Sequence, residues 1–465
     1  MREKSLKWMI GALFILAILI AGVWSGIHAL KSRTAVPQPV VEQVQEEPEP
    51  TSFESQLRQT AQPTENPPEE PTFEPSPAQL PKTEEPTENL FADPTPGPET
   101  LQGRTEEELL KEYIAGMSVQ DKIGQLVMFG FSGTSTVSKD FRRILSKYHV
   151  GNVVLYGSNI FKSDESGGFD TARKLTRRLE NANETGIPFL ISIDIEGGVV
   201  LRFRWHSAPN SARTLGKKND YDLAYKQFFR VGEKLKDVGI NMNLAPVLDI
   251  SENAMKTVLR SRIISGNPEV AANIGNAIIN GLRDAKCLST AKHFPGHGGT
   301  TQDSHATTPV IRKSLEEMKE YDLIPFQAAV DNGVDTVLVA HISYPKIDDQ
   351  NIASLSEIFI TKLLREEMGH TGLIMSDDFR MTGVTSQHTV GEAAVQFILA
   401  GGDIILCGPR HDLQEKIMEG LTNAAESGAL TEARLDESVY RILSKKMKVT
   451  EWNPMQASAS EEADS

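Results

Sequence analysis

The sequence predicts an α/β fold, a single-domain (β/α)8 TIM barrel preceded by a transmembrane helix and a disordered stalk. Two observations carry this prediction: eight short apolar runs alternate with helical patterns, and the first hundred residues differ sharply in composition from the rest. The chain has 465 residues, 39% of them hydrophobic, which suits one large core better than several independent domains.

The first 33 residues have the pattern of a transmembrane signal anchor. Arg2, Lys4 and Lys7 precede an apolar run over residues 8–30, which as a helix would be about 34 Å long, enough to cross a bilayer. A buried core helix and a cleavable signal peptide are the alternatives, but the run is longer than a signal-peptide core. We expect a single-pass cell-membrane protein with an extracellular globular domain, or a secreted one if the segment is cleaved.

The next segment is dominated by Pro, Glu, Gln and Thr, so it buries too little apolar surface to offset its conformational entropy. Globular patterning then begins with a capping-box pair, Thr105 and Glu108. The predicted boundaries are the anchor at 1–33, the disordered linker at 34–103, the barrel at 104–448 and a disordered polar tail at 449–465.

Eight apolar runs separated by helical stretches predict a parallel sheet that is buried on both faces. They cover residues 125–131, 150–156, 188–194, 240–249, 288–295, 335–341, 372–378 and 402–407. Eight such units fit a (β/α)8 barrel with insertions, and a doubly wound open sheet is the alternative. One helix, capped by Ser314 and Glu317, is expected to continue to Ala329, and the last helix is expected over residues 431–447.

Composition excludes several classes of partner and site. The net charge is −15 and the sequence pI is about 5.3, so the chain lacks the basic surface that binds nucleic acid. The two cysteines, Cys287 and Cys407, lie in apolar surroundings, where they are expected to be core residues and not disulfide or zinc ligands. We expect no metal and no cofactor.

Five of the apolar runs end in a titratable residue, where barrel proteins carry their chemistry. These residues are Asp194, Asp249, His293, His341 and Asp377. Carboxylates and imidazoles that converge without a Gly-rich phosphate loop indicate acid/base or nucleophilic work on a neutral substrate, as in a hydrolase or a transferase. Because neighbouring strand residues point to opposite faces, only one of Asp377 and Asp378 is expected to face the site.

A glycine-rich segment, KHFPGHGGTTQDSH, covers residues 292–305, from the end of the fifth run onward. Asp303 and His305 are two residues apart, so the carboxylate can accept a hydrogen bond from one imidazole nitrogen while the other faces the substrate. That arrangement fixes the tautomer of a general acid/base. A solvated polar loop is the plainer interpretation of these two residues alone.

This segment, together with LIMSDDFRM at 373–381, resembles glycoside hydrolase family 3 and, within it, the bacterial β-N-acetylglucosaminidase (β-N-acetylhexosaminidase) branch. The resemblance runs from about residue 117 to 446 and includes SIDIEGG at 192–198 and NLAPVLDI at 243–250. Three places depart from the family pattern: Val199, Ile263 with Ile264, and Phe379.

The resemblance implies a retaining exo-glycosidase with Asp377 as the nucleophile and His305, assisted by Asp303, as the acid/base. It also implies that five further residues bind the sugar: Asp194, Arg202, Arg262, Lys292 and His293. The expected substrate is a glycan with a terminal, non-reducing GlcNAc, from peptidoglycan fragments or chito-oligosaccharides, and the chain is expected to act as a monomer bound to the membrane through its N-terminal helix.

Three alternatives to the hydrolase stay open. An imidazole acid/base leaves room for phosphate in place of water, which would make the protein a β-N-acetylglucosaminide phosphorylase. A metal-dependent barrel hydrolase would also place histidines at strand ends, but the first run lacks the His-x-His pair that such an enzyme usually needs. The third alternative is a non-catalytic, wall-tethered sugar-binding module.

Overall fold

The computed structural model describes residues 104–160, 168–203, 205, 207–300, 307–385 and 388–454. The expected membrane anchor, the expected stalk, most of the expected tail and the Asp303/His305 pair lie outside these ranges. Within them, none of the helices combines the length and the apolar character that a membrane span requires.

The core of the described chain is a sheet of eight strands paired in parallel. They are β1 (Val127–Gly130), β2 (Asn152–Leu155), β3 (Leu190–Ile193), β6 (Met242–Asn243), β7 (Leu288–Phe294), β8 (Thr336–Val339), β11 (Leu373–Ser376) and β12 (Ile405–Cys407). Their order is β11-β8-β7-β6-β3-β2-β1-β12. A parallel bridge between Met375 and Ile404 joins the two ends, so the sheet closes almost completely into a barrel.

Each predicted apolar run contains one of these strands, which confirms the barrel. The open-sheet alternative is wrong, because the first strand pairs with the last one, with Val127 opposite Ile405. Two antiparallel hairpins extend the loops that follow β3 and β8. They are β4 (Ile195–Gly197) with β5 (Val200–Leu201), and β9 (Ser343–Tyr344) with β10 (Asp348–Ile352).

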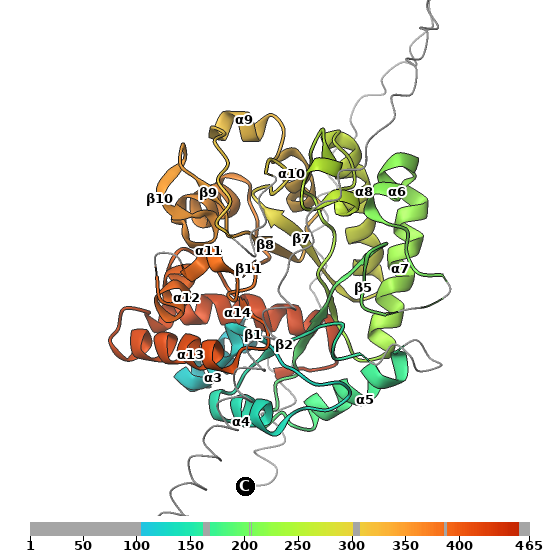
Figure 1. Cartoon of the computed structure of the whole chain (residues 1–465). Helices are drawn as coiled ribbons and strands as arrows, with labels where there is room; N and C mark the ends of the chain where they lie inside the picture. The colour runs from blue at the N-terminus through green and yellow to red at the C-terminus, as the bar shows by residue number, and fades with distance from the viewer. Residues whose placement is uncertain are drawn as a thin grey trace, which may run out of the picture. The chain divides into compact units, whose positions relative to one another are not determined.

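Helices surround the strands on the outside of the barrel (Figure 1). The α-helices are α2 (Glu106–Gly116), α3 (Val119–Gln125), α4 (Lys139–Tyr148), α5 (Phe169–Glu180), α6 (Ala212–Lys218), α7 (Tyr221–Asp237), α8 (Pro268–Asp284), α9 (Leu315–Lys319), α10 (Ile324–Asp331), α11 (Thr382–Thr385), α12 (Val390–Leu399), α13 (His411–Glu426) and α14 (Glu432–Val449). Short 3-10 turns are η3 (Ala254–Lys256), η4 (Arg260–Arg262) and η5 (Ala353–Leu355), and η6 (Ile358–Glu367) is π-helical.

The helix expected to run from Ser314 to Ala329 is in fact two helices, α9 and α10. The capping box of Ser314 and Glu317 is present, but α9 ends at Lys319. Pro325 lies in the first turn of α10, where its missing N–H needs no partner. The final helix is confirmed, with Thr431 as its N-cap, and it continues two residues past the expected end to Val449.

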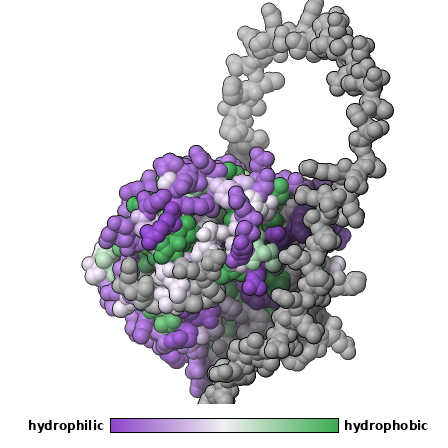
Figure 2. All heavy atoms as spheres, turned by 45° about the horizontal axis from the view of Figure 1, so that its top comes forward, coloured by the Kyte–Doolittle hydropathy of each residue, from purple (hydrophilic) through white to green (hydrophobic). Residues whose placement is uncertain are grey.

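The sheet of the barrel is buried on both of its faces. All seven residues of β7 are buried, and most of the buried apolar side chains belong to one cluster. Cys287 and Cys407 are buried and form no disulfide, as expected from the sequence. On the face seen in Figure 2, the described surface is largely hydrophilic, with hydrophobic residues in small separate patches.

Candidate active site

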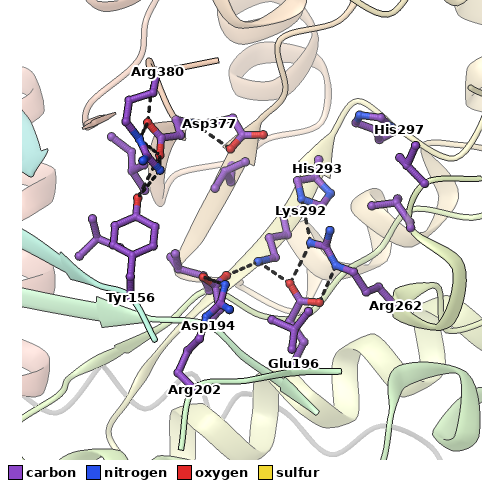
Figure 3. A pocket seen from close by; sticks show the side chains of 18 residues that line it. Tyr156, Asp194, Glu196, Arg202, Arg262, Lys292, His293, His297, Asp377 and Arg380 are labelled. Carbon is purple, nitrogen blue, oxygen red and sulfur yellow. Dashed lines mark hydrogen bonds and ion pairs between the residues drawn. The ribbon is translucent and has the colours of Figure 1, made fainter. Parts of the chain in front are cut away.

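A pocket with a volume of ≈ 280 Å³ lies at the carboxyl ends of the barrel strands. Charged side chains dominate its wall and come from segments that follow or end β3, β6, β7 and β11, while the segment after β2 contributes a tyrosine (Figure 3). They are Asp194, Glu196, Arg202, Arg262, Lys292, Asp377, Asp378 and Arg380, joined by Tyr156, His293 and His297. This volume is close to the lower end of the range for ligand pockets, so it suits one sugar unit better than a chain of them.

Lys292, near the end of β7, is the centre of an ionic network in this pocket. Its side chain is only 4% exposed, and its Nζ lies 2.7 Å from Asp194 Oδ1 and 2.7 Å from Glu196 Oε1. Burial opposes the positive charge, but the two carboxylates outweigh burial and raise the pKa of Lys292. The ammonium therefore stays charged in a site from which most water is excluded.

Two arginines complete the network. Arg262 binds Glu196 through two hydrogen bonds, Nε to Oε2 at 2.8 Å and Nη2 to Oε1 at 2.9 Å. Arg202 Nη2 lies 3.4 Å from Asp194 Oδ2. Burial works against the ionised form of Asp194, yet Lys292, Arg202 and Arg262 together lower its pKa to about 2. Both carboxylates are therefore fixed as acceptors for hydroxyl groups of a ligand.

The hairpin of β4 and β5 brings Arg202 back beside Asp194. Gly197, the last residue of β4, has φ +87°, and a Cβ there would lie 2.2 Å from the carbonyl oxygen of Asn210. Only glycine satisfies both the left-handed backbone and the close approach. Val199, at the position where the family usually has arginine, does not displace Arg202, which still lines the pocket.

Asp249, which lies behind the pocket wall, orients His293 at the end of β7 and His297 in the loop that follows. It is fully buried, and its Oδ2 accepts hydrogen bonds from His293 Nδ1 at 2.6 Å and from the His293 backbone N–H at 3.1 Å. Its other oxygen accepts the backbone N–H of His297. With Nδ1 held by Asp249, His293 presents Nε2 toward Arg262 Nη2, 3.4 Å away.

Asp377 lies immediately after β11 and borders the pocket. Its backbone N–H donates to Val339 O at 3.0 Å, and its Oδ1 accepts the backbone N–H of Asp378 at 2.8 Å. Burial alone would raise the pKa of Asp377, but His293 and His341, helped by that N–H and by Lys292, lower it. The carboxylate is therefore ionised at neutral pH, as a nucleophile requires.

His341 stands behind Asp377 and does not line the pocket. It is fully buried, its Nδ1 lies 2.7 Å from Ser354 Oγ, and burial lowers its pKa in spite of the nearby charges of Asp377 and Asp378. His341 therefore supports the site from behind the pocket wall.

Asp378 also borders the pocket, which corrects the expectation that only one of the two neighbouring aspartates can do so. The strand ends at Ser376, so the alternation of faces no longer applies to the two residues beyond it. Asp378 Oδ2 accepts hydrogen bonds from Tyr156 Oη at 2.9 Å and from Arg380 Nη2 at 2.6 Å. The guanidinium of Arg380 in turn stacks over the Tyr156 ring, 5.2 Å from its centre.

The structure brings together nearly all the site residues that the sequence predicts within its described ranges. Those that line the pocket are Asp194, Arg202, Arg262, Lys292, His293 and Asp377. Asp249 and His341 lie behind it, and Asp303 and His305 fall outside the described residues. Sequence reasoning missed Glu196, Tyr156, His297 and Arg380 as pocket residues. For Glu196 and Tyr156 the signal was available, since both stand within two residues of a predicted strand end.

The described ranges contain no group of three His, Cys, Asp or Glu side chains arranged to hold a metal ion. The geometry defines a barrel protein whose preformed pocket presents both fixed acceptors and fixed donors to a polyhydroxylated ligand, next to an ionised carboxylate.

Residues 118–445 match the glycosyl hydrolase family 3 N-terminal domain. The match covers well over half of the chain, and the protein belongs to glycoside hydrolase family 3.

Several similar proteins carry hexosaminidase names. The chain is 29% identical over 342 residues to beta-hexosaminidase A of Pseudoalteromonas piscicida, covering 68% of this chain and 56% of that protein. It is 33% identical to a beta-hexosaminidase of Tolumonas auensis, covering 62% of this chain and 84% of that protein. A solved family 3 beta-N-acetylglucosaminidase from Paenibacillus sp. str. FPU-7 is 36% identical, with a TM-score of 0.67, covering 72% of this chain and 63% of that one. The chain thus spans less than two thirds of the Pseudoalteromonas and Paenibacillus proteins.

Proposed function

We propose that the protein is a retaining exo-β-N-acetylglucosaminidase that hydrolyses terminal, non-reducing GlcNAc from peptidoglycan fragments or chito-oligosaccharides. The observation that carries this proposal is the ionised carboxylate of Asp377 at the edge of a pocket for one sugar, opposite the network around Lys292. Family membership and the names of the relatives support the same activity.

The network suits recognition of a sugar because each of its charges is already paired. Asp194 and Glu196 remain acceptors, while Lys292 and Arg262 remain donors, and none has to change its protonation when the ligand arrives. Such preorganised groups bind hydroxyls without the reorganisation that water would need.

In the first step, one carboxylate oxygen of Asp377 attacks the anomeric carbon, the bond from that carbon to the leaving oxygen breaks, and a general acid gives the leaving oxygen a proton. In the second step, the group that was the general acid acts as a base and takes a proton from water. The water oxygen attacks the anomeric carbon and releases the Asp377 carboxylate. Atoms and charge balance over the two steps, and the configuration at the anomeric carbon is retained.

For the acid/base we propose His305, assisted by Asp303. Two observations support this proposal. One is the KHFPGHGGTTQDSH motif, and the other is the position of residues 292–300, the part of the motif that the structure describes. There, Lys292, His293 and His297 all line the pocket. The proposed pair follows this described stretch in the sequence.

We also propose that the N-terminal helix anchors a monomer in the cell membrane and that the acidic linker holds the barrel outside the cell. The support is the apolar run and the composition of the first 103 residues. An extracellular barrel would meet cell-wall fragments, which is why we favour peptidoglycan fragments over chitin as the source of the GlcNAc.

The test is release of p-nitrophenol from p-nitrophenyl β-N-acetylglucosaminide by the full chain, in parallel with Asp377→Asn, His305→Ala and the exposed control Asp412→Asn. We expect activity to fall at least about 1,000-fold in Asp377→Asn and about 100-fold in His305→Ala, and to be unchanged in the control.

EDTA and phosphate complete this experiment. Activity that survives EDTA and does not gain from phosphate supports the hydrolase. Loss of activity in EDTA would favour a metal-dependent hydrolase, and a gain with phosphate would favour the phosphorylase. No turnover of this substrate or of a glucoside would favour the sugar-binding module.

A further inference from the structure

A second pocket lies on the outer side of the barrel, between α7, α8 and the turn that follows α10. It has a volume of ≈ 450 Å³, within the range of ligand pockets, and shares no residue with the wall of the active-site pocket. Asp284 and Asn332, two of its lining residues, stand just ahead of β7 and β8. The pocket is therefore near the amino ends of the strands, whereas the active site is at their carboxyl ends.

Two tyrosines one turn apart on α7 form one side of this second pocket. Tyr221 and Tyr225 are four residues apart, so their rings lie on the same face of the helix, and both are half-buried. Tyr221 Oη accepts a hydrogen bond from Asn280 Nδ2 at 2.6 Å, and Tyr225 Oη donates one to Asp284 Oδ2 at 2.7 Å. Each ring is thus held at its hydroxyl end, so a ligand that stacks on it costs little side-chain entropy.

Close packing of the helices holds the aromatic rings in a row. The helices α7 and α8 lie side by side (Figure 1), and a Cβ on Gly281 would lie only 2.5 Å from Tyr225 O. Phe229, one turn further along α7, stacks on Tyr225 with ring centres 6.2 Å apart. The row from Tyr221 to Phe229 covers eight residue steps, about 12 Å of helix, which is longer than one sugar ring.

Hydrogen bonds link the polar groups of the second pocket from α8 to the turn after α10. Arg283 Nη1 donates to Asn280 Oδ1 at 3.0 Å, and its Nη2 donates to Gly333 O at 3.2 Å. Asn332 Nδ2 donates to the same Asn280 oxygen at 3.0 Å. The guanidinium and both amides are therefore held in place before a ligand arrives.

Several oxygens of this pocket are left to accept hydrogen bonds from a ligand. In the part of the chain that the structure describes, the Asp222 carboxylate, Asp284 Oδ1 and Asn332 Oδ1 form no hydrogen bond or ion pair. Carboxylate and amide oxygens accept hydrogen bonds from hydroxyl groups. Because two carboxylates stand beside one guanidinium, the pocket also disfavours an anionic ligand. Aromatic faces next to such acceptors suit a neutral, polyhydroxylated molecule.

We propose that this pocket is a second carbohydrate-binding site, which takes neutral GlcNAc units from the interior of a glycan chain. The rings of Tyr221 and Tyr225 cover the C–H face of a sugar, while Asp222, Asp284 and Asn332 accept its hydroxyl groups. The choice of GlcNAc rests on the proposed function. The site goes beyond that function, because an enzyme that removes terminal units would stay attached to a glycan between cleavages, at a raised effective concentration.

The experiment measures binding of the full chain to insoluble chitin by co-sedimentation, in the Asp377→Asn background so that the polymer is not degraded. An active site for terminal units can hold only chain ends, which are scarce in the polymer, so binding reports the second site. Tyr221→Ala/Tyr225→Ala should weaken binding about tenfold, because both stacking rings are lost. Raising the salt concentration should leave binding unchanged, because the sugar carries no charge.

A single substitution at the rim supplies the matched comparison. Asp222→Ala should weaken binding about threefold. Its control is Glu233→Ala, at another exposed carboxylate of α7 that has no partner in the described ranges, and this variant should bind like the parent. With Asp377 restored, all these variants should keep the wild-type kcat/KM on the aryl glycoside, which shows that their barrel is folded.

Chitin binding equal to that of the parent in both pocket variants, or binding that salt abolishes, would overturn the second site. If the tyrosine variant does not fold, Asp222→Ala alone decides, because its side chain makes no hydrogen bond or ion pair within the described ranges. Failure of the wild type to turn over the aryl glycoside would overturn the proposed function, whereas the binding result, obtained without turnover, would be unaffected.

Discussion

Lys292 and Lys446 are both buried lysines, at opposite ends of the barrel, and their surroundings give them opposite properties. Lys292 Nζ meets two carboxylates, each at 2.7 Å, and its pKa is raised (Figure 3). Lys446, on α14, meets only neutral acceptors: Gln125 Oε1 at 2.6 Å and Gly151 O at 2.9 Å. Burial lowers the pKa of Lys446 to about 7, and the charge of Glu180 offsets only a small part of this effect.

The difference shows what a buried charge needs in order to stay charged. Neutral hydrogen-bond acceptors satisfy the donors of an ammonium, but they do not compensate for the loss of water around a full charge. Carboxylates do so at the mouth of the barrel, in the pocket where we propose that the sugar binds. At the other end, the same side chain is accommodated as a group close to neutrality at physiological pH.

The largest effect is expected when Lys292 is removed. Lys292→Met leaves Asp194 and Glu196 as neighbouring buried carboxylates with fewer cations, so the free energy of unfolding should fall by about 3–5 kcal/mol and kcat/KM by about 100-fold or more. Denaturant unfolding and the aryl glycoside assay measure the two quantities. Lys346→Met, at a lysine that is 53% exposed, is the control and should change neither. A stable, active Lys292→Met protein would contradict the paired-charge account.

Lys446→Met should change how stability depends on pH. The pKa of this lysine is about 7 in the folded chain and near the ordinary 10.5 in the unfolded chain, so between these values the unfolded chain holds the additional proton and stability rises with pH. Between pH 7.5 and 9.5, the wild type should gain about 1.4 kcal/mol per pH unit relative to the variant. The measurement is denaturant unfolding of both proteins at several pH values. If their free energies of unfolding change with pH in parallel, Lys446 is charged in the folded chain.

A smaller effect is expected for the pair of Glu196 and Arg262. A double-mutant cycle of Glu196→Gln and Arg262→Lys should give a coupling energy of about 1–3 kcal/mol in the free energy of unfolding. The matched exposed pair, Arg410 with Asp412, has similar distances of 2.8 and 2.7 Å, but should give less than about 1 kcal/mol. Equal coupling in the two pairs would show that burial adds nothing.

The smallest effect is expected for Tyr156→Phe. The variant loses one hydrogen bond to Asp378, which keeps its contacts with Arg380, so the free energy of unfolding should fall by about 1 kcal/mol. Tyr225→Phe is the control, because Tyr225 Oη donates to Asp284 at 2.7 Å on the surface and should matter less. A loss above about 3 kcal/mol would mean that Arg380 without the Tyr156 hydroxyl is not enough to hold Asp378 in place.

The strands and most of the site could be predicted because they depend on local pattern and on topology. Apolar, β-branched runs form buried strands, and the carboxyl ends of parallel strands meet at one face, which is enough to bring Asp194, His293 and Asp377 together. Lys292 is part of β7 itself, so its place near the strand end follows from the same rule.

What escaped prediction depends on where an element stops or on packing between distant segments. Asp378 borders the pocket because β11 ends one residue before Asp377, and strand ends are the least certain feature of a sequence pattern. Lys446 shows the second case, because a lysine in an amphipathic helix is normally expected to face water, and its burial arises only when α14 packs against α2 and α3.

Covalent trapping shows directly whether Asp377 is the nucleophile. The full chain is incubated with a 5-fluoro derivative of a GlcNAc glycosyl fluoride, which should form the glycosyl intermediate faster than water releases it, and its peptides are then analysed by mass spectrometry. We expect one added fluorinated GlcNAc on Asp377, and none in Asp377→Asn. A label on Asp378 or on another residue, or turnover with inversion at the anomeric carbon and no label, would contradict it.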